Sequence, residues 1–347
     1  MERKLVSIQQ IKSISPVSGA DKIEVAEIKD WKVVVNKGIH KVNDFVIFYE
    51  IDSFLPIQPR YDFLLKGSKS KKILVDGIEQ EGVRIKTKKI RGQISQGLIM
   101  PIVEFGGIIP DSRIVIGEDI TEFLGVIKYE PPIPAQLAGT VKGFFPSYIP
   151  KTDEERIQNM ADVLTGFYVT EKLDGTSVTF FRKDGVFGVC SRNLELTETK
   201  DNTQWRIARE LNLPEKLPDN FVIQGELVGE GIQGNPLKIS GQKVYFYNVY
   251  KLVENATYLG DGMYLDFTNF KGFIEGLGLE TVPIIDDNFT LPKTVAELLT
   301  YADGKSLINP NCPREGVVIR PKIEMTYKDQ RLSFKVISNE YLLKNEV

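Results

Sequence analysis

Short runs of β-branched and aromatic residues, separated by turn residues, mark the first 130 positions of the chain. Val33–Val35 and Phe45–Tyr49 are two such runs, and Gly38 and Asn43-Asp44 lie between them. Runs of this composition bounded by Gly, Asn or Asp are typical of β-strands. Residues 1–130 are therefore predicted to form a β-rich domain.

One segment of this domain alternates apolar with basic residues. Val83–Lys88 reads as a single strand with a period of two, which would place Arg84, Lys86 and Lys88 on one face. Between residues 60 and 100, ten Lys or Arg residues stand against four Asp or Glu residues. A small barrel with one basic strand face suits an OB-fold that binds oligonucleotides. A solvated strand face of any β-domain remains an equally open interpretation.

The pattern changes after a proline-rich stretch. Pro131, Pro132 and Pro134 cannot continue a helix or strand, so residues 131–150 are predicted to be a linker. The second domain then covers 151–347, and its class is α+β. Its expected helices are 152–163, 202–212, 267–276 and 294–303. Its expected strands are 167–171, 178–182, 186–191, 221–226, 244–250, 316–320 and 333–337.

Composition narrows the possible chemistry. The chain has 347 residues, a net charge of -3, two cysteines and one histidine. A disulfide framework and a multi-histidine metal site are therefore excluded, and a reduced, intracellular, cytoplasmic setting is the expectation. We expect no secretory signal and no membrane contact, because the chain start lacks an apolar core and no apolar run is long enough to span a bilayer.

A lysine at the end of a predicted strand is the first candidate for chemistry. Glu171-Lys172-Leu173-Asp174-Gly175 follows an apolar run and leads into turn residues. A lysine becomes a nucleophile when its surroundings lower its pKa, and Asp174 could hold a metal ion beside the amine. On its own, this short pattern more often marks an exposed lysine before a turn.

Further charged and aromatic residues follow in a consistent order at predicted strand ends. Arg192 could clamp a phosphate, Glu226 could accept a hydrogen bond from a ribose hydroxyl, and one ring of Tyr245–Tyr247 could stack on a purine. Glu315 opens a late apolar strand, and Lys335 lies on the last one. The ordered set makes a chance origin of the lysine pattern improbable.

These motifs resemble those of the covalent nucleotidyltransferases, which include ATP-dependent ligases and capping enzymes. Within that superfamily the sequence is most similar to ATP-dependent RNA ligases of the Deinococcus and Naegleria type. The basic β-rich domain precedes the lysine motif, as in that group, and the stretch from residues 20–26 through residues 91–97 looks like its OB module. The resemblance implies an N-terminal OB-like β-barrel followed by an antiparallel-sheet, ATP-grasp-like ligase domain.

The resemblance also implies a reaction in three steps. Lys172 attacks the α-phosphate of ATP and forms a lysine–AMP adduct, AMP passes to a 5′-phosphate end, and a 3′-hydroxyl then seals the strand. The implied partner is RNA, as a nicked or broken duplex, and the implied role is RNA repair. The sequence does not indicate the oligomeric state.

Roles for individual residues follow from the same resemblance. The catalytic set is Lys172, Asp174, Glu226, Glu315 and Lys335. The three carboxylates among them, Asp174, Glu226 and Glu315, are expected to hold Mg²⁺ or Mn²⁺. The expected ATP contacts are Glu171, Lys172, Arg192, Glu226, Lys335 and Phe246, the last by stacking on adenine. Lys151 and Arg156 are candidates for the triphosphate tail or the 5′-phosphate end.

Two positions depart from the family pattern. The last motif usually carries two lysines two residues apart, but Ser333 and Ile337 flank Lys335 at that spacing. Lys322 or Arg331 could supply the second cation. Ser177 stands where a related RNA ligase group has asparagine. Alternatives to the RNA ligase hypothesis are a non-catalytic, OB-containing RNA-binding protein, a DNA ligase and a capping-type enzyme.

Overall fold

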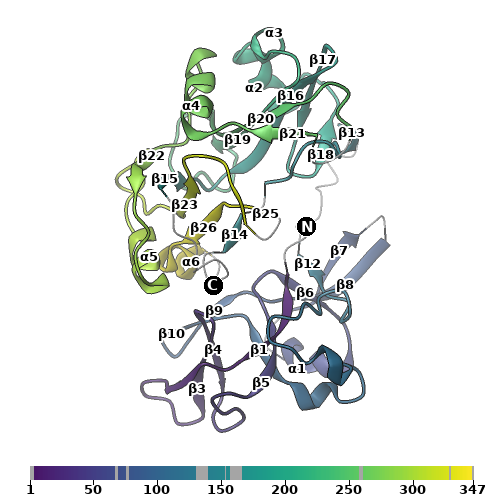
Figure 1. Ribbon diagram of the computed structural model, residues 1–347, viewed down its shortest axis with the longest axis vertical. Coiled ribbons are helices and arrows are strands. Elements are labelled where there is room, and N and C mark those ends of the chain that lie inside the picture. The colour runs from purple at the N-terminus through teal and green to yellow at the C-terminus, as the bar shows by residue number, and fades with distance from the viewer. Residues whose placement is uncertain are drawn as a thin grey trace. The chain divides into compact units, whose positions relative to one another are not determined.

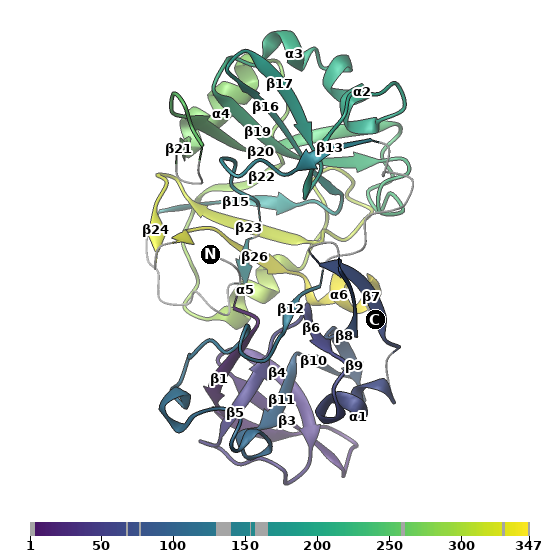
Figure 2. The ribbon, with the colours of Figure 1, turned by 90° about the vertical axis from the view of Figure 1, so that its right-hand side faces the viewer.

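The computed structural model describes most of the chain in two compact units (Figures 1 and 2). The described residues are 4–66, 69–75, 78–129, 140–152, 154–156, 166–257, 261–327 and 330–345. One unit comprises Met1–Ile133 together with Leu342–Val347, and the other comprises Pro134–Tyr341. Each unit has its own apolar clusters, so each is considered by itself below.

The described part of the N-terminal unit contains small antiparallel sheets, the short α-helix α1 (Asp62–Leu65) and short 3-10 helices. Two three-stranded sheets have the orders β1-β5-β11 and β2-β3-β4, a third has the order β12-β6-β8-β7, and β9 pairs with β10. The bounds are β1 Val6–Gln10, β2 Ser13–Pro16, β3 Ile23–Ile28, β4 Trp31–Asn36, β5 Phe45–Tyr49, β6 Ser53–Pro56, β7 Lys71–Val75, β8 Ile78–Arg84, β9 Thr87–Ile90, β10 Gln93–Gln96, β11 Leu98–Pro101 and β12 Ile127–Lys128.

Strand β5 explains why the N-terminal unit has two apolar clusters. Val46 and Phe48 pack into one cluster with Trp31, whereas Ile47 and Tyr49 pack into the other. Alternate side chains of a strand point to opposite faces, so β5 is buried on both. This double burial accounts for its unbroken apolar sequence.

The basic segment of this unit is not one strand. Strand β8 ends at Arg84 and pairs with β6 and β7, whereas β9 begins at Thr87 and pairs with β10. Between them, Ile85 exchanges backbone hydrogen bonds with Ser53 and Asp52, and the chain passes into another sheet. The prediction of a single strand over 83–88 was therefore wrong, although apolar Val83 and Ile85 are buried as the alternation requires.

The C-terminal unit is built on two sheets. One has the order β13-β18-β17-β16-β19-β20-β21, and the other has the order β14-β26-β23-β15-β22. The strands of the first sheet are β13 Val141–Phe144, β16 Thr176–Lys183, β17 Val186–Cys190, β18 Leu194–Leu196, β19 Phe221–Gly229, β20 Gln242–Leu252 and β21 Gly262–Tyr264. Those of the second are β14 Glu155–Arg156, β15 Phe167–Lys172, β22 Ile284–Phe289, β23 Gly316–Pro321 and β26 Phe334–Ile337, and β24 Thr326–Tyr327 pairs separately with β25 Gln330–Arg331.

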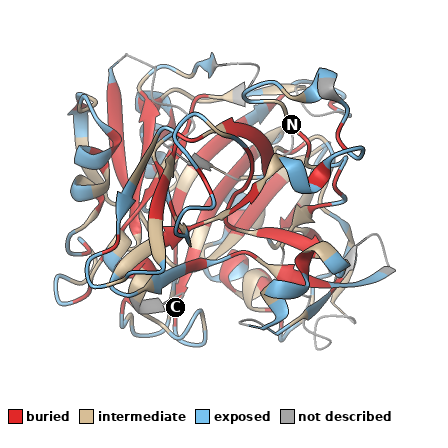
Figure 3. Cartoon of the chain, turned by 90° about the horizontal axis from the view of Figure 1, so that it is seen from below, coloured by how far each residue is buried: buried red, intermediate tan, exposed pale blue. Residues whose placement is uncertain are grey.

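Helices cover the outer faces of these two sheets. Apolar side chains of α2 (Thr203–Glu210), α3 (Leu213–Lys216) and α4 (Phe267–Gly276) share one cluster with the seven-stranded sheet. Helix α5 (Val295–Ala302) packs on the five-stranded sheet, and α6 (Asn339–Asn345) follows β26. The strands between are largely buried, as the colouring of Figure 3 shows. The remaining faces of the sheets are therefore where polar side chains can gather.

Two predicted boundaries need correction. Part of the predicted helix 152–163 is strand β14, which pairs in parallel with β26, and residues 153 and 157–163 lie outside the described residues. Part of the predicted linker 131–150 is strand β13, and Ile149 is buried; residues 131–139 lie outside the described part. Prolines marked the composition change but not where the second sheet begins.

Candidate active site

Lys172 is the last residue of β15, a strand that lies between β22 and β23. The chain then turns at Asp174 and Gly175 and enters β16. A Cβ atom at Gly175 would lie 2.3 Å from the Leu227 carbonyl oxygen, so this turn approaches β19 closely and requires glycine. The turn thereby brings the end of one sheet against the middle of the other.

The amine of Lys172 pairs with a carboxylate from the neighbouring strand. Lys172 Nζ lies 2.6 Å from Glu315 Oε1, and the two side chains are only 25% and 15% exposed. The register explains the pair, because Lys172 stands opposite Gly316 and Glu315 immediately precedes it. An antiparallel pair places the end of one strand against the start of the other.

Glu226 and Asp174 complete an acidic surrounding for this amine. Burial raises the pKa of Glu226 to about 8, and the charges of Glu315 and Asp174 add to this effect while Lys172 opposes it. Burial lowers the pKa of Lys172, but the three carboxylates outweigh burial and leave it above its ordinary value. Burial likewise raises the pKa of Glu315 despite its contact with Lys172. The site therefore holds Lys172 as an ammonium.

Three other predicted cations reach this neighbourhood to different degrees. Arg192 is exposed beyond the end of β17, and its charge partly opposes the rise in the pKa of Glu226. Lys335 lies on β26 opposite Val318, and its charge partly opposes the rise in the pKa of Glu315. Lys151 is exposed and is followed by Thr152, whose hydroxyl contacts Tyr247. The structure thus brings Arg192 and Lys335 within electrostatic range of the carboxylates.

The backbone of Arg156 is described but its side chain is not. Arg156 pairs with Lys335 through the parallel contact of β14 with β26. Its predicted contact with a phosphate lies outside what the structure describes and stays a prediction.

Phe246 cannot stack on a purine in this structure. Its side chain is fully buried in the apolar cluster between the seven-stranded sheet and its helices. There its ring centroid lies 6.1 Å from that of Phe180. The choice of Phe246 was therefore wrong. Strand β20 points its alternate residues Tyr245 and Tyr247 to the opposite face, into a small cluster with Leu173. Tyr247 is the more exposed of the two, so it is the better candidate for stacking.

A cluster of hydroxyl groups surrounds Tyr247, and no pattern in the sequence indicated it. Tyr247 Oη lies 3.0 Å from Ser177 Oγ and 3.2 Å from Thr152 Oγ1. Ser177 stands opposite Glu226 in the β16–β19 register. Alternation along β20 alone could not have indicated this, because Tyr247 is the extra residue of a β-bulge: Gln224 pairs with Asn248 and Gly225 pairs with Phe246.

A buried arginine lies beside Ser333, one of the two positions where the family's second lysine would stand. Ser333 accepts a hydrogen bond from Arg320 Nε at 2.8 Å, and Arg320 is buried and paired with Glu154 at 2.6 Å. Arg331 pairs with Glu324, and its guanidinium lies 3.6 Å from the Tyr264 ring centroid. The cation beside Ser333 is therefore Arg320, which the sequence did not single out.

Glu171 presents an unused acceptor. The side chain is 1% exposed, and Oε2 accepts a hydrogen bond from the Leu307 amide at 2.7 Å. Oε1 is buried and has no hydrogen-bond partner within the described part of the chain. A buried carboxylate oxygen without a donor is costly, and the nearby Ser306 side chain lowers the pKa of Glu171 against the effect of burial, which raises it.

The donor set fits a divalent cation held partly through water. Within the described ranges, no three acidic, histidine or cysteine side chains converge closely enough to bind a metal ion directly. Glu315 Oε2 is nevertheless buried and lacks a hydrogen-bond partner among the described residues. Mg²⁺ keeps several of its water ligands in protein sites, so one or two carboxylates suffice.

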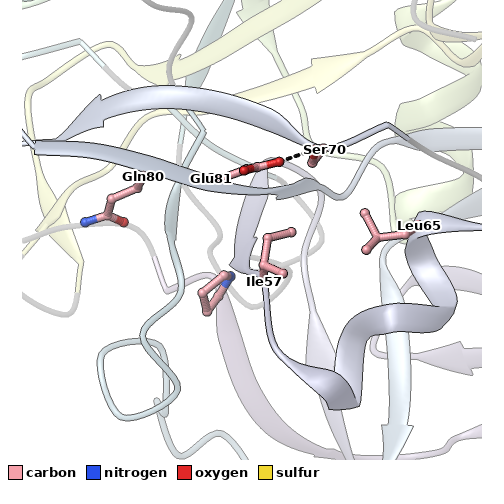
Figure 4. A pocket seen from close by; sticks show the side chains of 6 residues that line it. Ile57, Leu65, Ser70, Gln80 and Glu81 are labelled. Carbon is pink, nitrogen blue, oxygen red and sulfur yellow. Dashed lines mark hydrogen bonds between the residues drawn. The ribbon is translucent and has the colours of Figure 1, made fainter.

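A separate cavity lies in the N-terminal unit (Figure 4). It is an open pocket of about 440 Å³, and Glu81 accepts a hydrogen bond from Ser70 at its wall. Its lining residues are Pro56, Ile57, Leu65, Ser70, Gln80 and Glu81. No predicted site residue is among them.

Comparisons with known proteins agree with this arrangement. The model of an OB-fold domain matches residues 5–102, and the RNA ligase model matches residues 165–337. A mutant of Naegleria gruberi RNA ligase with AMP and Mn is 38% identical, with a TM-score of 0.84, and each chain covers 99% of the other. The chain belongs to the RNA ligase family. The predicted fold, an OB domain followed by a ligase domain, is confirmed.

Two further structures of the Naegleria gruberi RNA ligase are similar to this ligase to the same extent. A mutant with ATP and Mn has a TM-score of 0.84, and the ligase with PPi has a TM-score of 0.83. Both are 38% identical, and the alignments cover 99% of each chain. No curated protein sequence matched the chain. None of the helices in the described ranges has the length and apolar character needed to cross a bilayer.

Proposed function

We propose that this ligase uses ATP to join 3′-hydroxyl and 5′-phosphate ends of RNA through a covalent Lys172–AMP intermediate, in the repair of nicked or broken duplexes. The observation that carries the proposal is the Lys172 amine, 2.6 Å from Glu315 and facing Glu226 and Asp174. ATP, AMP, PPi and Mn accompany the similar Naegleria ligase structures, which supports the same ligands here.

The first step requires the amine to lose its proton. Lys172 is an ammonium in the resting site because Glu315 and the other carboxylates raise its pKa. A bound Mg²⁺ or Mn²⁺ would disfavour the ammonium and neutralise charge on the phosphates. Asp174, Glu226 and Glu315 are the residues that would hold it, in part through water.

ATP would lie along the face of β20 that carries Tyr247. The unpaired Oε1 of Glu171 suits the amino group of adenine, and the Tyr247 ring suits its face. Arg192 and Lys335 supply positive charge for the ribose and α-phosphate region. The Lys172 nitrogen then bonds to the α-phosphorus, the bond to the bridging oxygen breaks, and pyrophosphate leaves.

The two later steps transfer the activated group. An oxygen of the 5′-phosphate attacks the adenylate, and the Lys172–phosphorus bond breaks, which returns the amine. The 3′-hydroxyl then loses its proton and attacks the activated 5′-phosphorus, and AMP leaves. Lys151 and Arg156 are proposed to contact the triphosphate tail or the 5′-phosphate end.

A substrate panel tests the function as a whole. Purified ligase is given ATP or GTP with Mn²⁺ and a nicked duplex whose 3′ end is ribose or deoxyribose. We expect sealing with ATP and a ribose 3′ end. Sealing only with GTP or only at deoxyribose ends would contradict the proposal, and binding of RNA without any sealing would indicate a non-catalytic RNA-binding protein.

A further inference from the structure

Tyr341, near the end of the chain, contacts the lysine motif. Its hydroxyl donates a hydrogen bond to Asp174 Oδ2, a residue 167 positions earlier in the sequence. The Tyr341 side chain is 8% exposed, so the contact is shielded from solvent. The family motifs named above end at Lys335 and give Tyr341 no role.

The backbone around Tyr341 is tied to the same site. Ser338 follows β26, and its amide donates to the Glu315 carbonyl at 2.9 Å. The Ser338 hydroxyl donates to Asp303 at 2.7 Å and accepts from the Tyr341 amide at 3.1 Å. The first turn of α6 is therefore fixed to the residue that pairs with Lys172, and this turn sets where the Tyr341 hydroxyl lies.

This contact decides which way Asp174 points. Asp174 lies in a turn, and its charge acts on the nearby Lys172 ammonium. A side chain in a turn is free to change rotamer unless a partner holds it. The Tyr341 hydroxyl occupies Oδ2, which keeps Asp174 from forming a second ion pair with Lys172 and leaves Oδ1 for a cation or a cation-bound water.

We propose that Tyr341 is a positioning residue for the first step, which holds the Asp174 carboxylate in the orientation that receives the divalent cation. The inference rests on the proposed function, because it assigns Asp174 to the metal. It adds the C-terminal helix to the parts of the chain that adenylylation requires.

The test combines Tyr341→Phe with Asp174→Asn in a double-mutant cycle. Removing the hydroxyl keeps the ring and its packing. We expect Tyr341→Phe to raise the Mn²⁺ concentration for half-maximal Lys172–AMP formation by about tenfold, which is the scale of one hydrogen bond to a charged group. Saturating Mn²⁺ should restore the rate, and adding Tyr341→Phe to Asp174→Asn should cause no further loss.

A second readout does not depend on activity. Mn²⁺ binding to the nucleotide-free protein is measured by the loss of the free Mn²⁺ signal in electron paramagnetic resonance. This binding should weaken in Tyr341→Phe by a similar factor. Tyr301→Phe is the matched control, since Tyr301 lies on α5 and packs against Phe289 of β22, and it should bind Mn²⁺ as the wild type does.

Three results would overturn the inference: an unchanged Mn²⁺ affinity in Tyr341→Phe, the same weakening in Tyr301→Phe, or an equal loss in the Asp174→Asn background. Failure of the proposed function looks different. In that case the wild type forms no Lys172–AMP at any Mn²⁺ concentration, while the binding measurement still reports on Tyr341.

Discussion

Lys172 Nζ and Glu315 Oε1 lie 2.6 Å apart, although 143 residues separate them in the sequence. The pair follows from the antiparallel contact of β15 with β23. It keeps the amine charged and therefore unreactive until other charges enter the site. The geometry without ligands thus keeps Lys172 protonated. A positive charge that binds beside Glu315 would favour loss of this proton.

Glu226 should make the stability of the metal-free protein depend on pH. Its folded pKa is about 8 because of burial, against 4.5 for the free side chain. As pH rises from 4.5 to 8, the unfolded state ionises while the folded state keeps its proton, so stability falls. In urea unfolding with a chelator present, wild type should lose up to about 1.4 kcal/mol per pH unit relative to Glu226→Gln. Parallel pH profiles for the two proteins would show that Glu226 is not perturbed.

The buried pair of Arg320 and Glu154 should be sensitive to removal of one partner. Arg320→Met leaves the Glu154 carboxylate buried and unpaired, which costs about 3–5 kcal/mol in the free energy of unfolding. Lys271→Met is the control, because its pair with Glu275 is exposed on α4 and contributes less than about 1 kcal/mol. Equal changes in urea midpoints would contradict the assignment.

Substitutions at Tyr247 and Phe246 should have different effects on the KM for ATP and on stability. Tyr247→Leu removes the ring from the site and should raise the KM for ATP in adenylylation by about tenfold or more, given the usual scale of base stacking. Tyr247→Phe keeps the ring and should not. Phe246→Leu should leave the KM unchanged and lower the free energy of unfolding, because it leaves a cavity in the core. A raised KM in Phe246→Leu instead would mean that the core residue does reach the nucleotide.

Lys86 separates RNA docking from adenylylation. Its side chain is exposed between β8 and β9, whereas Arg84 pairs with Asp52 at 2.6 Å, so reversal of Arg84 would also disturb the fold. Lys86→Glu should weaken RNA binding and sealing, and lower the salt dependence of binding by about one phosphate contact. Lys172–AMP formation should not change. Lys32→Glu, an exposed lysine of β4, is the control, and equal weakening by both variants would argue against a docking role for Lys86.

Local patterns predicted elements well where an element has an apolar face or is a continuous apolar run. The helix at 267–276 agrees with α4, and the strand at 316–320 agrees with β23. Local patterns failed where the secondary structure of a segment depends on which strand lies beside it. Val83–Lys88 keeps one alternation but divides between two sheets, and Glu155–Arg156 becomes a strand because β26 lies beside it.

The site shows the same division. Lys172, Glu226 and Glu315 carry recognisable patterns because each stands beside a run of apolar strand residues. Tyr341 has no such pattern, since its role depends only on where α6 starts. Phe246 was misassigned because the direction of each ring on β20 depends on which face the helices cover.

The most direct measurement is the mass of the intact protein after incubation with ATP and Mn²⁺, followed by mapping of the modified peptide. The account predicts one added AMP in the wild type, located on Lys172, and no adduct in Lys172→Met. An adduct of the same size in Lys172→Met, or one mapped to another residue of the wild type, would contradict it.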